Sequence, residues 1–380
     1  MNKITGTIKR YLNTTDFVLL LLCVLTSLFS VVCLYSLVGS SIAETLRISK
    51  RTYLVQSLAS VIGITAAVII SFFDYHFIAK LWKLYVPASV FLVLLTFVIG
   101  VQVDETVDDK AWLLLPMGLS FQPSELMKIC FILSFAYHLS RIHGQINTLP
   151  NIILLCAHGL IPVILVHFQG DDGTAAIFLA IMVTMLFAAG LSWKYIIAAI
   201  PAAAIIIPIA WQYVLSDDQR NRFLSVFISE YSDIKNIGYQ QNRSLISIGT
   251  GKLMGRGLFS EDYLYVPELH NDFIFSFIGQ ATGFVGCMIV LALIGGICFR
   301  TLSNARTSLD PLGTYICYGV FAMLFTQYVI NIGMCLSIIP VIGVTLPLLS
   351  AGGTSVAITY LGIGLILSVH SHKKNNLFYQ

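Results

Sequence analysis

Apolar runs of about 20 residues recur along almost the whole chain, and they limit its fold more than any other feature, because a helix that crosses a bilayer needs about that length. Hydrophobic residues make up 57% of the 380 residues and charged residues only 11%, against about 25% charged in an average soluble domain. This composition excludes a soluble enzyme, a disordered chain and a nucleic-acid-binding protein. The runs are continuous, which disfavours a membrane β-barrel with strands of about 10 residues and alternating polarity.

We therefore predict an all-α polytopic membrane protein that forms one integral membrane domain over residues 1–380. Ten runs are candidates for transmembrane helices: Phe17–Val38, Tyr53–Phe73, Trp82–Val101, Gln122–Ser140, Ile152–His167, Thr174–Gly190, Trp193–Val214, Asp272–Phe299, Leu312–Asn331 and Thr354–His370.

One further apolar run, Met334–Leu349, contains Pro340, Gly343 and Pro347. Proline and glycine interrupt helices, and irregular backbone at membrane depth requires protein or water to satisfy its polar groups. The sequence predicts a broken or re-entrant segment before the tenth span.

The distribution of Lys and Arg predicts the orientation, because cytoplasmic loops are enriched in both. An N-terminus in the cytoplasm gives an excess of basic residues inside and, with ten spans, puts both termini there. Residues 215–271, between the seventh and eighth spans, then form a large extracytoplasmic loop. Its alternating apolar and polar residues predict short amphipathic helices on the membrane surface. The short outer loops hold only four basic residues, Arg47, Lys50, Arg51 and Lys110.

Polar residues at membrane depth are costly and mark a candidate site by default. Glu125 and Lys128 are three residues apart, so they share a helix face. They could form either a site or a neutralised ion pair that stabilises helix packing. In the turn that holds Asp171, a helix cap is a better interpretation than a cation site.

Two clusters lie in or next to the predicted outer loop. Arg243 and Lys252 stand among glycines, which suits an anionic phosphate group or contacts with lipid headgroups. Glu268, His270 and Asp272 crowd the expected start of the eighth span. Asp272 suits a helix N-cap, but the cluster could also supply a general base.

A glycine pair precedes Thr354 and Ser355 at the expected start of the tenth span, where an anion, a sugar or a simple helix cap would fit. Most of these clusters map to the predicted outer face. A secondary transporter would instead place its site near the bilayer midplane. The pattern therefore favours an interfacial enzyme that acts on a lipid-linked headgroup.

Several motifs in this order resemble the SEDS family (shape, elongation, division and sporulation), which includes the RodA, FtsW and SpoVE types; the RodA type is favoured here. They are FQPSELMK at 121–128, NRSLISIGTGKLMGRGL at 242–258, VPELHNDFIF at 266–275, NIGM at 331–334 and PVIGVTLPLLSAGGTS at 340–355.

The resemblance implies that the protein polymerises peptidoglycan glycan strands from lipid II, outside the bacterial cytoplasmic membrane. The reaction would be an inverting glycosyl transfer with a polyprenyl pyrophosphate leaving group, in elongation, division or sporulation. Asp272 would be the general base for the sugar 4-hydroxyl. Basic residues would hold the pyrophosphate, alone or with a divalent cation such as Mg²⁺ or Mn²⁺, and a class B penicillin-binding protein would be the partner. The other expected substrate contacts are Lys110, Trp112, Gln122, Ser124, Glu125, Lys128, Asp171, Arg243, Lys252, Glu268, His270, Ser350, Thr354 and Ser355.

Five positions depart from the family pattern: Ala111 replaces an arginine, Gly170 a proline, Gln280 and Ala281 acids, and Ala351 a tyrosine. These departures indicate a divergent paralogue, and two alternatives stay open: a lipid II flippase and a catalytically weak scaffold for the transpeptidase.

Overall fold

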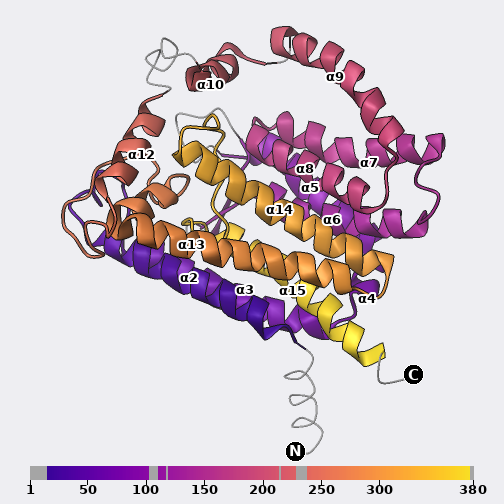
Figure 1. Cartoon of the computed structure of the whole chain (residues 1–380), viewed down its shortest axis with the longest axis horizontal. Coiled ribbons are helices and arrows are strands. Elements are labelled where there is room, and N and C mark those ends of the chain that lie inside the picture. Colours follow the sequence, from indigo (N-terminus) through magenta and orange to yellow (C-terminus); the bar gives the residue numbers. More distant parts are fainter. Residues whose placement is uncertain (1–14, 102–109, 117–118, 214, 228–237, 377–380) are drawn as a thin grey trace, which may run out of the picture.

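The computed structural model describes residues 15–101, 110–116, 119–213, 215–227 and 238–376, as a bundle of long helices with one small hairpin (Figure 1). The elements are α2 (Phe17–Val38), α3 (Lys50–Phe72), α4 (Tyr75–Lys80), α5 (Trp82–Ile99), β1 (Leu113–Leu115), β2 (Leu119–Phe121), α6 (Pro123–Arg141), α7 (Leu149–His167), α8 (Asp172–Ala188), α9 (Trp193–Tyr213), α10 (Asp217–Phe227), α12 (Tyr239–Thr250), α13 (Ile274–Thr307), α14 (Pro311–Cys335) and α15 (Gly353–Asn376).

A helix occupies each of the ten predicted ranges. Among the described residues, seven of these helices, rather than ten, are long and apolar enough to cross a membrane. Of the other three, α8 is apolar but shorter, and α6 carries three charged side chains. Val214, the predicted end of the seventh span, and residues 228–237 of the predicted loop lie outside the described residues. The protein is a multi-pass membrane protein whose qualifying helices are α2, α3, α5, α7, α13, α14 and α15.

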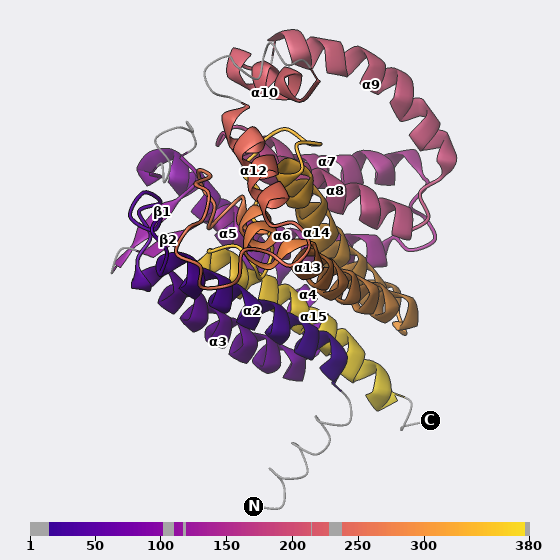
Figure 2. The same ribbon diagram turned by 60° about the vertical axis from the view of Figure 1, so that its left-hand side comes forward.

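The centre of the bundle lies at α14 and α15. In their most apolar stretches 61% and 67% of the residues are buried, against 17% in α5. Helix α15 packs along α3. Figure 2 shows α2, α3 and α15 running together along one side of the bundle. Their contact is close because Gly364 has no side chain: a Cβ there would lie 2.8 Å from Ala67 Cα. Small residues permit such approaches between membrane helices.

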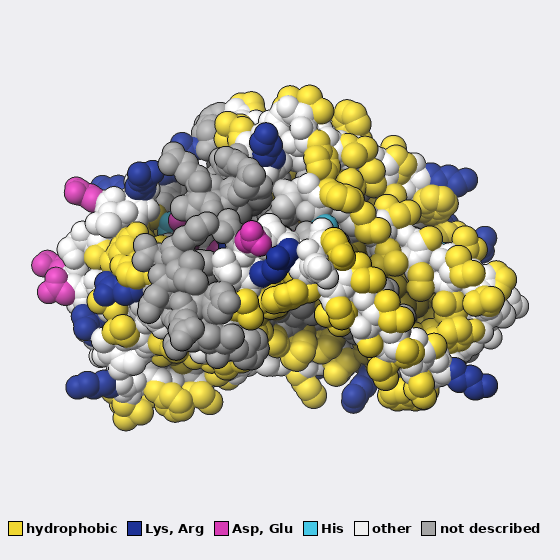
Figure 3. Space-filling model, turned by 90° about the horizontal axis from the view of Figure 1, so that it is seen from above, with side chains coloured by type: hydrophobic (Ala, Val, Ile, Leu, Met, Phe, Trp, Pro, Cys, Tyr) yellow, Lys and Arg dark blue, Asp and Glu magenta, His cyan; other side chains and the backbone are white. Residues whose placement is uncertain are grey.

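Much of the outer surface is apolar. Figure 3 shows hydrophobic side chains over a large part of the described surface in view, with charged side chains scattered among them. Val98 on α5 is 81% exposed and Leu84 is 71% exposed. Exposed apolar surface of this extent suits contact with lipid rather than water.

Two boundaries differ from the sequence predictions. Helix α13 begins at Ile274 with Phe273 as its N-cap, so Asp272 is not the cap. It also extends to Thr307 and changes direction at Gly283, which has φ 67° and ψ −163°. The antiparallel β1–β2 hairpin was not expected in an all-α fold; it pairs Leu113 with Phe121.

The segment between α14 and α15 is irregular, as the proline and glycine pattern predicts. It is nevertheless buried from Leu346 to Ser350. Protein groups satisfy part of its backbone: Gln241 Nε2 on α12 donates to Ile339 O at 2.7 Å. Buried irregular backbone is stable only with such partners.

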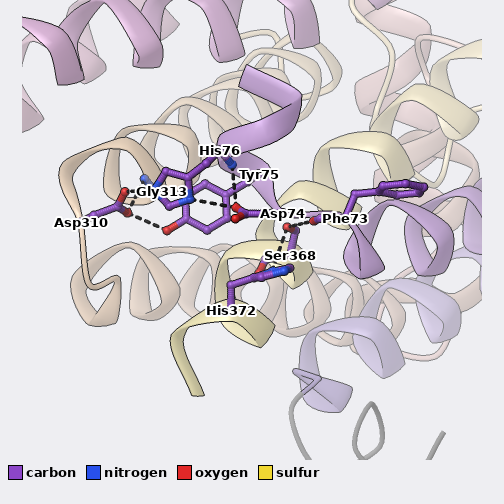
Figure 4. Close-up of polar contacts among 8 residues, drawn as sticks. All are labelled: Phe73, Asp74, Tyr75, His76, Asp310, Gly313, Ser368 and His372. Atoms are coloured by element: carbon purple, nitrogen blue, oxygen red, sulfur yellow. Dashed lines mark hydrogen bonds and ion pairs between the residues drawn. The ribbon is translucent and has the colours of Figure 1, made fainter. Parts of the chain in front are cut away.

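A polar network closes one end of the bundle (Figure 4). Asp310 accepts a hydrogen bond from Tyr75 Oη at 2.7 Å, and its other oxygen lies 2.7 Å from His76 Nε2. The second ring nitrogen of His76 lies 2.8 Å from Asp74 Oδ1. Ser368 Oγ on α15 donates to the C-cap carbonyl of α3. These bonds join the α3–α4 turn, the α13–α14 turn and the last part of α15.

Candidate functional site

Asp272 lies in a partly buried loop between α12 and α13. This loop precedes α13 and the network lies at the turn after α13, so the two are at opposite ends of that long helix (Figure 1). Within the loop, Asn271 Nδ2 donates to Glu268 Oε2 at 2.7 Å. The loop is bound to the irregular segment, because Ser350 Oγ donates to Asn271 O at 2.7 Å. The segment's next backbone N–H donates to His270 O at 2.9 Å. The structure therefore brings the predicted residues Glu268, His270, Asp272 and Ser350 together.

The end of α14 holds the backbone at Asp272. Asn331 Nδ2 donates to Asp272 O at 2.8 Å and to Val344 O in the irregular segment at 2.7 Å. Gly343 lies beside the carboxylate with φ +64°, and a Cβ there would be 3.7 Å from Asp272 Oδ2. The Asp272 carboxylate thus lies near the backbone of Gly343.

A second polar cluster lies at the starts of α6 and α8. Lys128 Nζ and Glu125 Oε1 are 2.8 Å apart, with side chains 0% and 8% exposed. Gln122 Nε2 donates to Asp171 Oδ2 at 2.7 Å, and Asp171 Oδ1 caps α8 by accepting from Thr174 N at 2.8 Å. The ion pair, one of the two alternatives for Glu125 and Lys128, is present, and Asp171 caps α8 as its turn favours. The pair lies within one helix and does not bridge two helices.

Burial raises the pKa of Asp171 above its ordinary value, whereas hydrogen bonds from Thr174 and the charge of Lys128 oppose that shift. The irregular segment separates this second cluster from Asp272. On one side, the Ile342 carbonyl packs so closely on Gly173 that no side chain fits there. On the other side, Gly343 faces Asp272. The two clusters therefore share one short strip of backbone.

His270 is a partly buried residue of this loop. Burial lowers its pKa, and the charge of Glu268 opposes the shift. Its Nδ1 has no hydrogen-bond partner among the described residues. A neutral imidazole with an unpartnered nitrogen can accept or donate one hydrogen bond to a bound molecule.

The predicted basic contacts have other surroundings in the structure. Lys110 and Lys252 are exposed at the surface. Arg243 Nε donates to Tyr265 O at 3.0 Å, and its guanidinium lies 6.0 Å from the Tyr239 ring centroid. Trp112 is partly buried and pairs with Val101 through the backbone.

Helix α12, which carries Arg243, packs on the bundle through its polar face. Gln241, Ser244 and Ser247 are buried, whereas Leu245 and Ile246 are 41% and 53% exposed. The predicted amphipathic helix is therefore present, with its apolar side turned outward.

The hydroxyl residues around the irregular segment mainly fix its conformation. Thr354 Oγ1 donates to Ser120 O in β2 at 3.0 Å, and Ser355 Oγ lies 3.4 Å from Thr345 Oγ1. Ser350 Oγ also accepts from Leu346 N at 2.7 Å. Ser124 Oγ, in the second cluster, is fully buried and has no hydrogen-bond partner among the described residues.

The departures from the family pattern have structural counterparts. Gly170 has φ +88°, which a proline ring cannot adopt. Ala111 is fully buried, so no arginine side chain would fit there without rearrangement. Gln280 is buried and accepts from Ser247 Oγ at 3.2 Å, and Ala351 contributes its backbone N–H to His270 O.

In the part of the chain that the structure describes, no three His, Cys, Asp or Glu side chains gather in a way that could hold a metal ion. Three residues that sequence reasoning did not assign to the site belong to it: Gly173, Asn331 and Gly343. Gly173 and Asn331 contact backbone carbonyls far away in the sequence, and Gly343 lies next to the Asp272 carboxylate, so only the NIGM and PVIG motifs could have pointed to two of them.

Comparison with known proteins gives the same picture over the whole chain. A family model described as cell cycle protein, for FtsW, RodA and SpoVE, matches residues 16–375. The chain is 29% identical to a probable peptidoglycan glycosyltransferase FtsW of Geobacter metallireducens, covering 97% of this chain and 96% of that protein. It is 33% identical over 288 residues to the peptidoglycan glycosyltransferase MrdB of Escherichia coli K12, covering 75% and 77% of the two chains.

Two solved structures share the fold. One, from work on the structural coordination of polymerization and crosslinking by a peptidoglycan synthase complex, has a TM-score of 0.79 at 26% identity and covers 95% of this chain and 98% of its own. The other is the rod shape determining protein RodA of Thermus thermophilus, with a TM-score of 0.68, 25% identity and coverage of 94% and 97%. The relatives divide between FtsW and RodA types, so they do not favour the RodA type alone. With a family model that spans residues 16–375, this chain belongs to the FtsW/RodA/SpoVE (SEDS) family of cell cycle proteins.

Proposed function

We propose that this protein is a peptidoglycan glycosyltransferase that polymerises lipid II at the outer face of the bacterial cytoplasmic membrane. Its similarity to the peptidoglycan glycosyltransferases FtsW and MrdB supports the activity. The observation that carries the proposal is the position of Asp272: a carboxylate held by its own backbone in a preformed loop, with glycine backbone beside it.

In the proposed reaction the 4-hydroxyl of one sugar attacks the anomeric carbon of another from the face opposite the leaving group. Asp272 accepts the hydroxyl proton as the new C–O bond forms, and the bond to the polyprenyl pyrophosphate breaks. Attack from the opposite face inverts the anomeric configuration. A base must lie within about 3 Å of the proton that it removes, so the carboxylate needs a fixed position.

Arg243, Lys110 and Lys252 would hold the pyrophosphate charge, because the only cation of the second cluster, Lys128, is buried and already paired with Glu125. The described residues offer no preformed set of metal ligands. A divalent cation, where one takes part, would add positive charge at the pyrophosphate.

The proposed topology has ten spans, with α6, α8 and α9 added to the seven helices that qualify by length and composition, and Leu336–Gly352 as a re-entrant segment. Both termini are then in the cytoplasm, as the Lys and Arg distribution predicts. The start of α2 and the end of α15 lie near the same part of α13. Asp16, the N-cap of α2, contacts Arg300, and His370 near the end of α15 contacts Asn304.

The proposed partner is a class B penicillin-binding protein that crosslinks the strand. The similarity to a chain from a peptidoglycan synthase complex supports this pairing. A lipid II flippase is less favoured, because Glu125, Lys128, Asp171 and Asp272 gather at one end of the bundle rather than along a path through it.

The test is glycan-chain synthesis by the purified protein from lipid II in liposomes, with and without the cognate transpeptidase. We expect polymer from the unaltered protein and none from Asp272→Ala. Asp310→Asn, at the opposite end of the bundle, is the control and should keep polymer synthesis. Equal polymer from Asp272→Ala would remove Asp272 from the mechanism, and no polymer from any variant, even with the partner, would refute the polymerase.

A further inference from the structure

One buried amide joins the three parts of the chain that surround Asp272. Asn331 is 0% exposed and lies in the last turns of α14. Its amide nitrogen donates to Asp272 O at 2.8 Å and to Val344 O at 2.7 Å. A side-chain amide has two N–H groups, so both donors are used. One side chain thus holds both the loop before α13 and the irregular segment against α14.

The two carbonyls lie next to the groups that define the space around the carboxylate. Asp272 O belongs to the residue that carries the carboxylate, and Val344 O follows Gly343, whose backbone faces Asp272 Oδ2. Gly343 has φ +64°, which disfavours any residue with a side chain. The distance between the carboxylate and this strip of backbone therefore depends on Asn331.

We propose that Asn331 is a positioning residue for Asp272: it sets the separation between the carboxylate and the Gly343 backbone, and so the width of the space in which the sugar hydroxyl meets its base. This inference rests on the proposed function, since it assigns Asp272 the role of base. Asn331 touches no substrate in this arrangement and acts through Asp272 and the irregular segment.

The variant Asn331→Leu has a side chain of similar size and removes both donors. A misplacement of about 1 Å near reacting groups can reduce the rate by about 100-fold. We expect kcat for lipid II polymerisation to fall by about 10- to 100-fold, with KM for lipid II changed by less than about threefold, because the binding groups stay in place. Asn331→Ser keeps one hydroxyl donor, so its kcat should lie between those of the unaltered protein and Asn331→Leu. It replaces the Leu variant in the test if that variant does not fold.

The chain offers a matched control at the other end of the bundle. Asn304 on α13 is 4% exposed, and its Nδ2 donates to Asp16 Oδ2 at 2.8 Å. Asn304→Leu removes a buried amide of the same kind, so it should lower the unfolding temperature by a similar amount. Its kcat should stay within about twofold of the unaltered protein.

A second readout does not depend on turnover. Carbodiimide modifies carboxylates, and peptide mass spectrometry gives the rate of modification at Asp272. We expect Asn331→Leu to change that rate by about threefold or more and Asn304→Leu to leave it unchanged.

The outcomes separate the two proposals. An unchanged kcat and an unchanged modification rate in Asn331→Leu would overturn the positioning role. An equal loss of kcat in Asn304→Leu would overturn it as well, since general destabilisation would then explain the loss. If the unaltered protein made no polymer, the proposed function would fail, and the modification rate alone would still decide whether Asn331 positions Asp272.

Discussion

The buried pair of Glu125 and Lys128 gives the sharpest test of the electrostatics at the site. Its two side chains are 8% and 0% exposed, so neither charge reaches bulk solvent, and their charged atoms are 2.8 Å apart. Lys128→Met removes the cation and leaves the Glu125 carboxylate buried, with Asp171 close enough to interact with both charges. Loss of one partner of a buried pair costs about 3–5 kcal/mol of unfolding free energy.

The double variant Glu125→Gln/Lys128→Met leaves no charge of the pair behind. Replacing a buried pair by neutral groups of similar volume is often close to neutral in stability. We therefore expect the double variant to lose about 1 kcal/mol, less than Lys128→Met alone. Because Glu125→Gln leaves the Lys128 ammonium buried without its partner, it should cost about as much as Lys128→Met, and the double-mutant cycle should give a coupling free energy of about 5 kcal/mol or more.

The assay is unfolding in mixed micelles titrated with a denaturing detergent, followed by helical circular dichroism, for all four members of the cycle. Asp217 and Arg220 on α10 are the control pair. They are also three residues apart and their charged atoms are 3.2 Å apart, but Asp217 is 89% exposed. Exposed pairs contribute less than about 1 kcal/mol. If the coupling at Glu125–Lys128 were as small as at the control pair, burial would not govern the energy of this pair.

The same variants decide whether the pair also acts in catalysis. A double variant with near-normal stability and polymer synthesis within about threefold would show that the pair serves packing. Normal stability with synthesis lost would show that the charges themselves contact the substrate or its pyrophosphate.

Three further changes test other parts of the structure by unfolding free energy. Asp310→Ala removes the acceptor of Tyr75 and the N-cap of α14 and should cost about 1–3 kcal/mol. Asp310→Asn keeps one oxygen acceptor and should cost less; an equal cost in the two variants would contradict this reasoning. Burial lowers the pKa of His270, so below about pH 6.5 the unfolded chain binds a proton at this residue more readily than the folded chain does. The unfolding free energy should therefore fall as the pH drops below that value, and His270→Gln should flatten the plot of unfolding free energy against pH. Gly173→Ala forces a methyl group against the Ile342 carbonyl and should cost about 1–3 kcal/mol, whereas Gly249→Ala, where a Cβ meets nothing within 4 Å, should cost none.

The helices could be predicted from the sequence because apolar run length translates directly into a spanning helix. The prediction of Asp272 as N-cap failed for a local reason: Phe273 N donates to Glu268 O, so the turn continues for one more residue before α13 begins. The hairpin was missed because Leu113–Leu115 looks like any other apolar run. Its strand character depends on pairing with Leu119–Phe121, and chain composition does not encode that pairing.

The site residues divide in the same way. Glu125 and Lys128 could be paired from sequence, because three-residue spacing fixes neighbours on a helix. Asn331 could not be assigned, because its acceptors are backbone carbonyls 59 and 13 residues away. Lys110 and Lys252 were grouped with the site by charge alone, and the structure places both side chains at the surface.

The helix ends explain how the site can favour anions with few cations inside it. The starts of α6 and α8 meet through Gln122 and Asp171, and the start of α15 meets β2, next to α6, through Thr354. The start of α13 follows Asp272. Each helix N-terminus carries a partial positive charge and favours a nearby anion by about 0.3–1 kcal/mol. In the proposed reaction, four such ends at one face of the bundle would add to the positive charge that Arg243, Lys110 and Lys252 offer to a departing pyrophosphate.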